Sequence, residues 1–234
     1  MFTVLVTGSS RGIGYAVAKE FLSQGFNVVI NGKNPENLLR AKATLSSLAS
    51  ENQVFAIEAD VSTRSGVTSL VEQFNSLNLS LDVVVNNAGL FLPGTMIDES
   101  EDQFETLWKV NLSSAYWLTK DLWETLRKSN RAHVINMCSI ASITAYDAGG
   151  TYSLVKHALL GFTKSLRKEG IPCGIRVTAI MPGATHTDSW AGVDLPQERF
   201  MDPQSVANVC YTAFAINRDT VMEEVILRPI LGDI

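Results

Sequence analysis

The sequence predicts a single α/β domain spanning residues 1–234, a doubly wound parallel sheet of seven strands with helices on both faces. Short runs rich in Val and Ile recur between longer segments of helical periodicity. These runs are nearly continuous in apolar residues, which is typical of strands buried on both faces of a parallel sheet. The predicted strands are Phe2–Thr7, Phe26–Asn31, Gln53–Ala59, Leu81–Asn86, Ala132–Met137, Gly174–Ile180 and Glu223–Arg228.

Composition and charge narrow the range of partners. The chain has 234 residues, 46% of them hydrophobic, which is enough to build one sizeable core. A net charge of -5 without any run of Lys or Arg argues against nucleic acid or a membrane as partner and leaves small molecules. The start MFTVLVTG does not resemble a signal peptide, and no apolar run is long enough to span a bilayer, so we expect a cytoplasmic protein.

Cysteine and histidine usage gives no indication of a metal site or of a disulfide framework. The three cysteines are widely spaced and odd in number, which fits a reducing compartment. The three histidines fall in no metal-ligand spacing with one another or with the cysteines. We therefore expect no metal.

A glycine-rich segment, TGSSRGIG from Thr7 to Gly14, joins the first predicted strand to a helix expected to begin at Tyr15. Gly8, Gly12 and Gly14 allow a tight turn and bring helix N–H groups close to a pyrophosphate, whose charge the helix dipole favours. The spacing G-x-x-x-G-x-G also occurs in purely structural turns, but its position between a first strand and a first helix favours dinucleotide binding. No Lys followed by Ser or Thr closes the motif, which excludes a P-loop.

The end of the second strand indicates which dinucleotide is bound. An acidic residue there usually holds a free ribose 2'-hydroxyl, but the sequence after Asn31 is Gly32, Lys33, Asn34. Lys33 and Arg11 suit a 2'-phosphate instead, so we predict NADP(H) rather than NAD. The alternative is that both are solvated surface charges.

Four blocks in order carry a family resemblance. TGSSRGIG is followed by NNAG ending at Gly89, by Ser139 with Tyr152 and Lys156, and by the pair Pro182 and Gly183. From the first strand to about Thr187 the chain resembles the short-chain dehydrogenase/reductase family, whose members are oxidoreductases with a Rossmann fold. Any one block could arise by chance, whereas the ordered set is specific.

The resemblance implies a set of cofactor-binding residues. Asp60 and Val61 would lie beside the adenine, Asn87 to Gly89 along the adenosine ribose, and Thr187 at the nicotinamide carboxamide. The implied set is Gly8, Ser10, Arg11, Gly12, Ile13, Gly14, Lys33, Asp60, Val61, Asn87, Ala88, Gly89, Tyr152, Lys156, Pro182, Gly183 and Thr187.

Four residues are candidates for catalysis. Reduction of a ketone by hydride requires a proton donor at the developing alkoxide, which Tyr152 can supply. Lys156, four positions later and so on the same helix face, can stabilise the phenolate. Ser139 can orient the substrate carbonyl, and Asn111 by resemblance holds a water that links Lys156 to solvent. Each alone has an ordinary structural explanation, but together they favour catalysis.

The resemblance implies an NADPH-dependent carbonyl reductase or alcohol dehydrogenase that transfers hydride between NADP(H) and a ketone or alcohol. A 3-oxoacyl carrier-protein reductase is one alternative. The segment PGATHTDSW and the end EEVILRPILGDI are similar to bacterial relatives of sepiapterin reductase, so a pterin reductase is another. An alternative of a different class is a non-catalytic NADP-binding redox sensor, which would not need Ser139, Tyr152 or Lys156.

Two further expectations concern the lid and the assembly. Residues 184–204 follow the sixth strand without regular periodicity, and we expect them to form a short substrate lid. Helices carrying Trp108, Tyr116, Trp117 and Trp123 have more aromatic surface than a monomer needs. A homodimer is therefore expected, with a homotetramer as the alternative.

Overall fold

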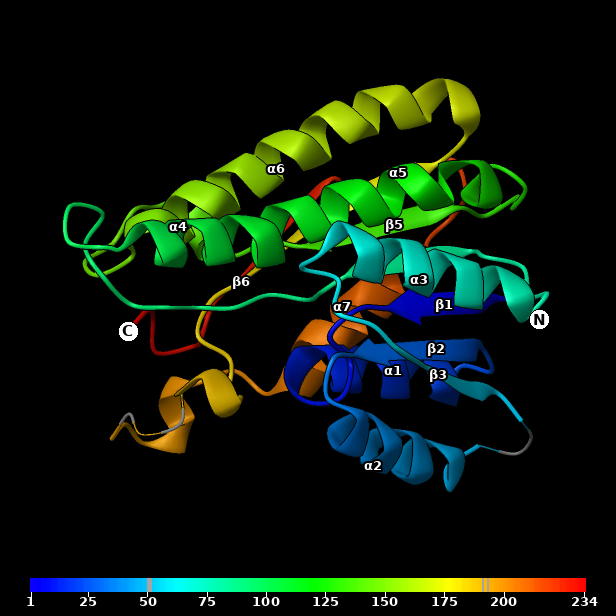
Figure 1. Ribbon diagram of the computed structural model, residues 1–234, viewed down its shortest axis with the longest axis horizontal. Helices are drawn as coiled ribbons and strands as arrows, with labels where there is room; N and C mark the ends of the chain where they lie inside the picture. Colours follow the sequence, from blue (N-terminus) through cyan, green and yellow to red (C-terminus); the bar gives the residue numbers. More distant parts are fainter. Residues whose placement is uncertain (50–51, 191, 193) are drawn as a thin grey trace.

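Seven parallel strands form one sheet in the order β3-β2-β1-β4-β5-β6-β7 (Figure 1). The computed structural model describes residues 1–49, 52–190, 192 and 194–234. The strands are β1 Thr3–Val6, β2 Asn27–Gly32, β3 Val54–Glu58, β4 Val83–Asn86, β5 His133–Met137, β6 Arg176–Pro182 and β7 Glu224–Leu227. The predicted doubly wound α/β fold is confirmed.

The order of the strands reverses at β1, which pairs with β2 on one side and β4 on the other. Leu5 of β1 lies between Val29 of β2 and Val84 of β4, and all three are fully buried. The helices that follow β1 and β4 lie on opposite faces of the sheet. Ligands of such folds bind at the carboxyl ends of the strands where the order reverses in this way.

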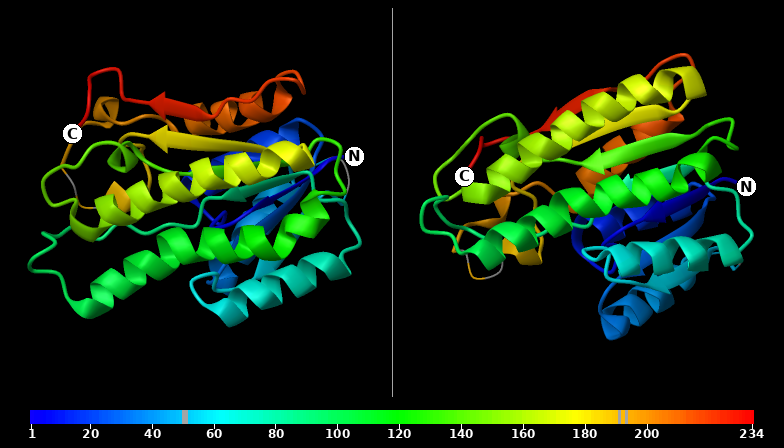
Figure 2. Two further views of the ribbon diagram at one scale, coloured as in Figure 1. Left: turned by 90° about the horizontal axis from the view of Figure 1, so that it is seen from above. Right: turned by 45° about the horizontal axis from the view of Figure 1, so that its top comes forward.

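Helices cover both faces of the sheet (Figure 2). One face carries a core cluster that includes Phe21, Leu45 and Phe214, and the other carries a cluster that includes Phe74 and Leu166. The first face is covered by α1 Gly12–Ser23, α2 Pro35–Ser46 and α7 Pro203–Ala215. The second face is covered by α3 Arg64–Ser76, α5 Ser114–Leu126 and α6 Gly150–Gly170. Helix α4, Glu101–Trp108, leads into α5. The two chain ends lie at opposite ends of the molecule (Figure 1).

The prediction that the strands are buried on both faces is correct for the centre of the sheet and wrong for the edge strand β7. Val225 and Leu227 pack against a core cluster, whereas the alternate residues Glu224 and Ile226 are exposed, Ile226 to 50%. The strand therefore alternates because the core covers only one of its two faces.

Helix α1 begins at Gly12, three positions before the expected start at Tyr15. Arg11 precedes it with extended backbone, at φ -164° and ψ 177°. The last two glycines of the motif are therefore already part of the first helical turn. Their N–H groups are among the orphan donors that a helix start presents.

A buried polar ladder ties α5 and α6 to the middle of the sheet. Asn86 Nδ2 donates to Thr119 Oγ1 at 2.9 Å and to Asn136 Oδ1 at 2.8 Å, and Asn136 Nδ2 donates to Thr163 Oγ1 at 2.9 Å. Buried amides are costly unless they are paired, so this ladder favours one register of the two helices on β4 and β5.

A π-helical turn, Lys109–Ser113, joins α4 directly to α5. Such a turn adds one residue to the helical repeat and is frequent at functional sites. Asn111 lies within it and is buried. In the part of the chain that the structure describes, no helix has the length and apolar character needed to cross a bilayer.

Candidate active site

The glycine turn after β1 packs so tightly that only glycine fits at two positions. Gly8 has φ +60°, and a Cβ atom there would lie 2.9 Å from Ala88 Cα. A Cβ atom at Gly14 would lie 2.4 Å from Asn87 Nδ2 and 2.6 Å from Gly8 O. The turn therefore rests directly on the segment that follows β4.

Thr7 and Asn87 lock these two segments together. Thr7 Oγ1 accepts hydrogen bonds from the backbone N–H groups of Asn87 and Ala88, each at 3.0 Å. Asn87 Nδ2 donates to the carbonyl oxygens of Thr7 at 2.9 Å and Gly8 at 3.1 Å. The glycine turn and the segment after β4 thus form a close-packed cradle at the start of α1, whose free helix N–H groups fit the pyrophosphate of a dinucleotide.

The side of this cradle next to β2 and β3 carries charged residues. A Cβ atom at Gly32 would lie 3.4 Å from Ser10 Oγ, so Ser10 adjoins the end of β2, which Lys33 follows in the chain. Burial raises the pKa of the Asp60 carboxyl, but two hydrogen bonds from Ser62 and the charge of Lys33 outweigh it and leave that pKa below its ordinary value. Lys33 thus lies close enough to Asp60 to act on its charge.

Arg11 contacts the expected lid, residues 184–204. Its Nη1 atom donates to Asp188 Oδ2 at 3.0 Å, and both side chains are about two-thirds exposed. The lid also lies against the glycine turn, because a Cβ atom at Gly12 would be 3.4 Å from Thr187 Cγ2. Arg11 therefore bridges the turn and the lid, where the sequence suggested only a place near the adenosine ribose.

Lys156 is held in the interior of the candidate catalytic cluster. Its ammonium donates to the carbonyl oxygen of Met137 at 2.9 Å, and the residue is 5% exposed. Burial lowers the pKa of Lys156 to about 8. The Nζ atom lies 5.6 Å from the centre of the Tyr152 ring, so the two predicted residues do share one side of α6.

Tyr152 lies between Lys156, Ser139 and Phe91. Burial raises the pKa of Tyr152 to about 12, while its contact with the Ser139 hydroxyl acts in the opposite direction. The Phe91 ring meets the Tyr152 ring edge-on, with centroids 5.0 Å apart. Ser139 follows β5 and begins the 3-10 turn Ile140–Ser142, where its Oγ atom accepts from Ala141 N at 3.1 Å.

Asn111 binds the backbone of Leu90, the residue that follows Gly89 at the end of the NNAG segment. Its Nδ2 atom donates to the carbonyl oxygens of Leu90 at 2.9 Å and Leu107 at 3.0 Å, and Oδ1 accepts from Leu90 N at 3.2 Å. A Cβ atom at Gly89 would lie 3.0 Å from Asn111 Oδ1 and 3.7 Å from Lys156 Nζ. The structure thus brings Asn111, Ser139, Tyr152 and Lys156 into one cluster.

Two residues of this region were missed in the sequence. Thr7 opens the glycine motif, and a hydroxyl at that strand end could have been recognised as a partner for the turn. Phe91 gives no signal, because a single aromatic residue after NNAG has the same pattern as a packed loop residue. Among the residues described by the structure, no group of three or more His, Cys, Asp or Glu side chains could hold a metal ion.

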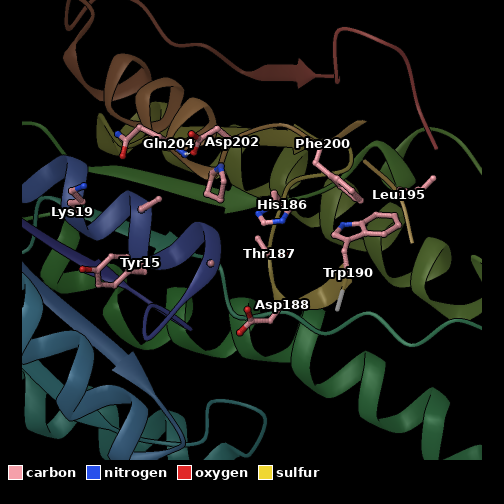
Figure 3. Close-up of a pocket in the computed structure, with 13 residues that line it drawn as sticks. Tyr15, Lys19, His186, Thr187, Asp188, Trp190, Leu195, Phe200, Asp202 and Gln204 are labelled. Atoms are coloured by element: carbon pink, nitrogen blue, oxygen red, sulfur yellow. Dashed lines mark hydrogen bonds between the residues drawn. The ribbon is translucent and has the colours of Figure 1, made fainter. Parts of the chain in front are cut away.

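The lid begins at the end of β6, where Gly183 N donates to Leu227 O at 2.8 Å. Its described residues contain two 3-10 turns, Asp188–Trp190 and Gln197–Arg199. Two residues of the expected range 184–204, Ala191 and Val193, are not among the described residues. A cavity of about 510 Å³ lies beside it, lined by α1, the start of α7 and lid residues that include His186 and Trp190 (Figure 3). The four candidate catalytic residues are not among the residues that line this cavity.

The strand order and the glycine turn are those of a dinucleotide-binding Rossmann protein. The sequence model of the family described as short chain dehydrogenase matches residues 2–197, and the chain belongs to this family of oxidoreductases.

Several similar proteins have named activities. The 3-oxoacyl-[acyl-carrier-protein] reductase of Aquifex aeolicus is 33% identical over 217 residues, which cover 88% of this chain and 86% of that protein. The sepiapterin reductase of Chlorobaculum tepidum is 29% identical over 239 residues, covering 99% and 97%. The alcohol dehydrogenase of the archaeon Thermococcus sibiricus, solved in complex with 5-hydroxy-NADP, has a TM-score of 0.90 at 25% identity and covers 98% of this chain and 97% of its own.

Proposed function

We propose that this oxidoreductase is an NADPH-dependent carbonyl reductase or alcohol dehydrogenase with Tyr152 as its general acid and base. The observation that carries the proposal is the cluster of Tyr152, Lys156 and Ser139 beside the glycine turn of the cofactor cradle. Bound NADPH supplies the hydride. The protein must then orient the carbonyl, provide a proton and exclude water.

In the direction of reduction, Tyr152 donates its phenolic proton to the oxygen of the substrate carbonyl. A pKa raised to about 12 keeps this proton on the ligand-free protein at neutral pH. The Lys156 ammonium, 5.6 Å from the ring centre, stabilises the phenolate that remains. Ser139 donates a second hydrogen bond to the same carbonyl and orients it. In the direction of oxidation the phenolate takes the proton of the alcohol.

The preference for NADP(H) rests on the positive charges at the adenosine side of the cradle. Lys33 acts on Asp60 there, and Arg11 immediately precedes α1. The alcohol dehydrogenase of T. sibiricus was solved with an NADP derivative, which supports the same choice here. We expect Gly8, Gly12, Gly14 and Thr187 to hold the pyrophosphate and nicotinamide.

Two substrate classes receive separate support. The identity to the A. aeolicus reductase favours a 3-oxoacyl thioester, and the coverage of the C. tepidum reductase to both chain ends favours a pterin with a side-chain ketone. Residues 184–204 are proposed as the lid over either substrate. Turnover of acetoacetyl thioester, a vicinal diketone, an aromatic aldehyde and a ketone-bearing pterin, with NADPH and NADH in parallel, distinguishes the classes.

The substitution Tyr152→Phe tests the catalytic proposal. It removes only the hydroxyl, so NADPH should bind with unchanged Kd while kcat falls about 100-fold or more. Equal turnover by wild type and variant would reject the Tyr152 mechanism. If the wild-type protein binds NADPH but reduces none of the four compounds, the redox-sensor alternative is favoured.

We also propose that the enzyme is a homodimer that pairs through α4 and α5. Phe104 and Trp108 stack with ring centroids 6.0 Å apart and are 42% and 37% exposed, and Tyr116 is 42% exposed. Exposed aromatic surface of this kind is typical of protein interfaces. Sedimentation of wild type and Trp108→Ala tests the pairing, and a wild-type monomer at micromolar concentration would contradict it.

A further inference from the structure

The segment between β4 and α4, residues 90–99, is attached at both ends to the catalytic cluster, and we call it the strap. At one end Asn111 holds both the N–H and the carbonyl of Leu90. At the other end Glu99 accepts a hydrogen bond from the backbone N–H of Thr151, at 3.0 Å to Oε1 and 3.3 Å to Oε2. Between them Gly94 N donates to Ala148 O at 3.1 Å. The strap therefore contacts the two elements that carry Asn111 and Tyr152.

Glu99 provides the cap that α6 lacks in its own sequence. Thr151 is the second residue of α6, so its N–H is one of the orphan donors at the helix start. Gly149, at the position before the helix, makes no side-chain cap, and the first turn has no acidic residue. A carboxylate at a helix start also interacts favourably with the helix dipole. The cap is thus supplied from another part of the chain.

The glycine before Thr151 makes room for this carboxylate. Gly150 has φ +34°, and a Cβ atom there would lie 2.0 Å from Glu99 Oε1 and 2.6 Å from Gly94 O. A side chain at this position would therefore displace either Glu99 or the strap. The absence of a side chain at Gly150 therefore leaves the space that the Glu99 carboxylate occupies.

The capped residue is the immediate neighbour of Tyr152. The Tyr152 ring is contacted on one side by Phe91, which belongs to the strap, and by the Lys156 ammonium. A shift of the first turn of α6 would change the position of the Tyr152 hydroxyl relative to Ser139 and Lys156. It would leave the glycine turn and its contacts with Asn87 untouched.

We propose that Glu99 is a positioning residue for Tyr152: by capping Thr151 it fixes the first turn of α6 and thereby the place of the catalytic hydroxyl. The inference rests on the proposed function, in which Tyr152 is the proton donor. Since a misplacement of about 1 Å can cost about 100-fold in rate, loss of this cap should lower kcat about 10- to 100-fold. The Kd for NADPH should not change.

The test compares Glu99→Ala with Glu99→Gln and with the matched control Glu101→Ala. Glu101 is exposed on the first turn of α4 and, unlike Glu99, makes no hydrogen bond or ion pair to α6 among the described residues. Glu99→Gln keeps one acceptor oxygen for the Thr151 N–H, so it should retain most of the wild-type kcat. Glu101→Ala should behave as wild type.

Two readouts separate positioning from a general loss of stability. In Glu99→Ala the apparent pKa of the pH profile for alcohol oxidation should rise by about 0.5 unit or more, because the phenolate lies farther from Lys156. Amide hydrogen exchange in the peptide containing Thr151 should become faster, whereas exchange in the glycine turn should not.

The outcomes also distinguish this inference from the proposed function. Wild-type kcat and an unchanged pH profile in Glu99→Ala would overturn the positioning role, as would equal loss in Glu99→Gln and Glu99→Ala. Turnover by Tyr152→Phe in the same assay would instead overturn the proposed function. Faster exchange at Thr151 without any change in kcat would identify Glu99 as a purely structural cap and reject its role in positioning.

Discussion

The ammonium of Lys156 donates a 2.9 Å hydrogen bond to the carbonyl oxygen of Met137, the last residue of β5. Ser139 follows two residues later on the same chain segment. The charge of Lys156 is therefore fixed relative to Ser139 through the backbone of one strand. The sheet thereby orients the buried amine of Lys156 toward the catalytic cluster.

The first prediction concerns the pH dependence of carbonyl reduction. Because burial lowers the pKa of Lys156 to about 8, the side chain is charged below that pH and becomes neutral above it. We expect kcat/KM for the ketone to be constant near neutral pH and to fall above about pH 8, as the cation beside Tyr152 is lost. In Lys156→Arg, whose guanidinium stays charged, the activity should be lower overall but without this alkaline decline. A profile that is flat to pH 10 in wild type would contradict the prediction.

The second prediction compares two glycines. In Gly14→Ala the new Cβ atom would lie 2.4 Å from Asn87 Nδ2, so the contact between the two turns is broken and NADPH affinity should fall about 10-fold or more. Gly161 lies on the exposed side of α6, and a Cβ atom there meets nothing within 4 Å. Gly161→Ala should therefore stabilise the protein by about 0.5–1 kcal/mol. Cofactor titration measures the NADPH affinity of Gly14→Ala, and urea unfolding measures the stability of Gly161→Ala. An NADPH affinity of Gly14→Ala equal to that of wild type would refute the role of the tight turn.

The third prediction concerns Arg11 and Asp188. Their ion pair is exposed, and such pairs contribute about 0.2–1 kcal/mol. If Arg11 binds the 2'-phosphate, Asp188 competes for it, so Asp188→Asn should bind NADPH up to about five-fold more tightly. Binding of NADH, which lacks that phosphate, should not change and serves as the control. Weaker NADPH binding in Asp188→Asn would indicate that the ion pair assists cofactor binding.

The fourth prediction concerns acid stability. His133 is fully buried, its Nε2 atom is 2.7 Å from Thr178 Oγ1, and among the described residues nothing reaches Nδ1. Burial, with the charges of Arg176 and Arg131, holds its pKa well below the ordinary value. The unfolded state therefore binds a proton that the folded state does not, so stability falls as the pH drops below about 6.5.

The expected loss from His133 between about pH 7.5 and pH 5.5 is about 1.4 kcal/mol in the free energy of unfolding. Urea unfolding at the two pH values measures it. The variant His133→Gln has no titrating ring and should lose less stability over this range than wild type. An identical pH dependence in both proteins would assign the acid sensitivity to other groups.

The sheet was predictable because its signals are local. Runs such as Leu81–Asn86 are apolar throughout and are separated by helical segments, and the structure confirms all seven strands and their parallel arrangement. The glycine motif, Ser139, Tyr152 and Lys156 could be recognised because the reaction requires these residue types at fixed intervals. Their roles in binding and catalysis stay predictions until the variants above are measured.

Contacts between distant parts of the chain could not be predicted. Glu99 reaches Thr151 because a loop after β4 folds against the start of α6, and neither segment alone shows it. Arg11 meets Asp188 for the same reason. The exposed face of β7 was missed because its apolar residues resemble those of a central strand, and only the order of strands makes it an edge.

The π-helical turn Lys109–Ser113 sets the rotational phase between α4 and α5. Each residue of an α-helix turns the chain by about 100°, so one residue more or less at this turn rotates everything on its amino-terminal side by that angle. A single deletion there would turn α4 about its own axis and pull the strap, with Glu99 and Phe91, out of alignment with α6. The number of residues in this turn therefore fixes which face of α4 is directed toward the catalytic cluster. A sequence alignment that shifts the turn by one residue would compare residues that lie on different faces of α4.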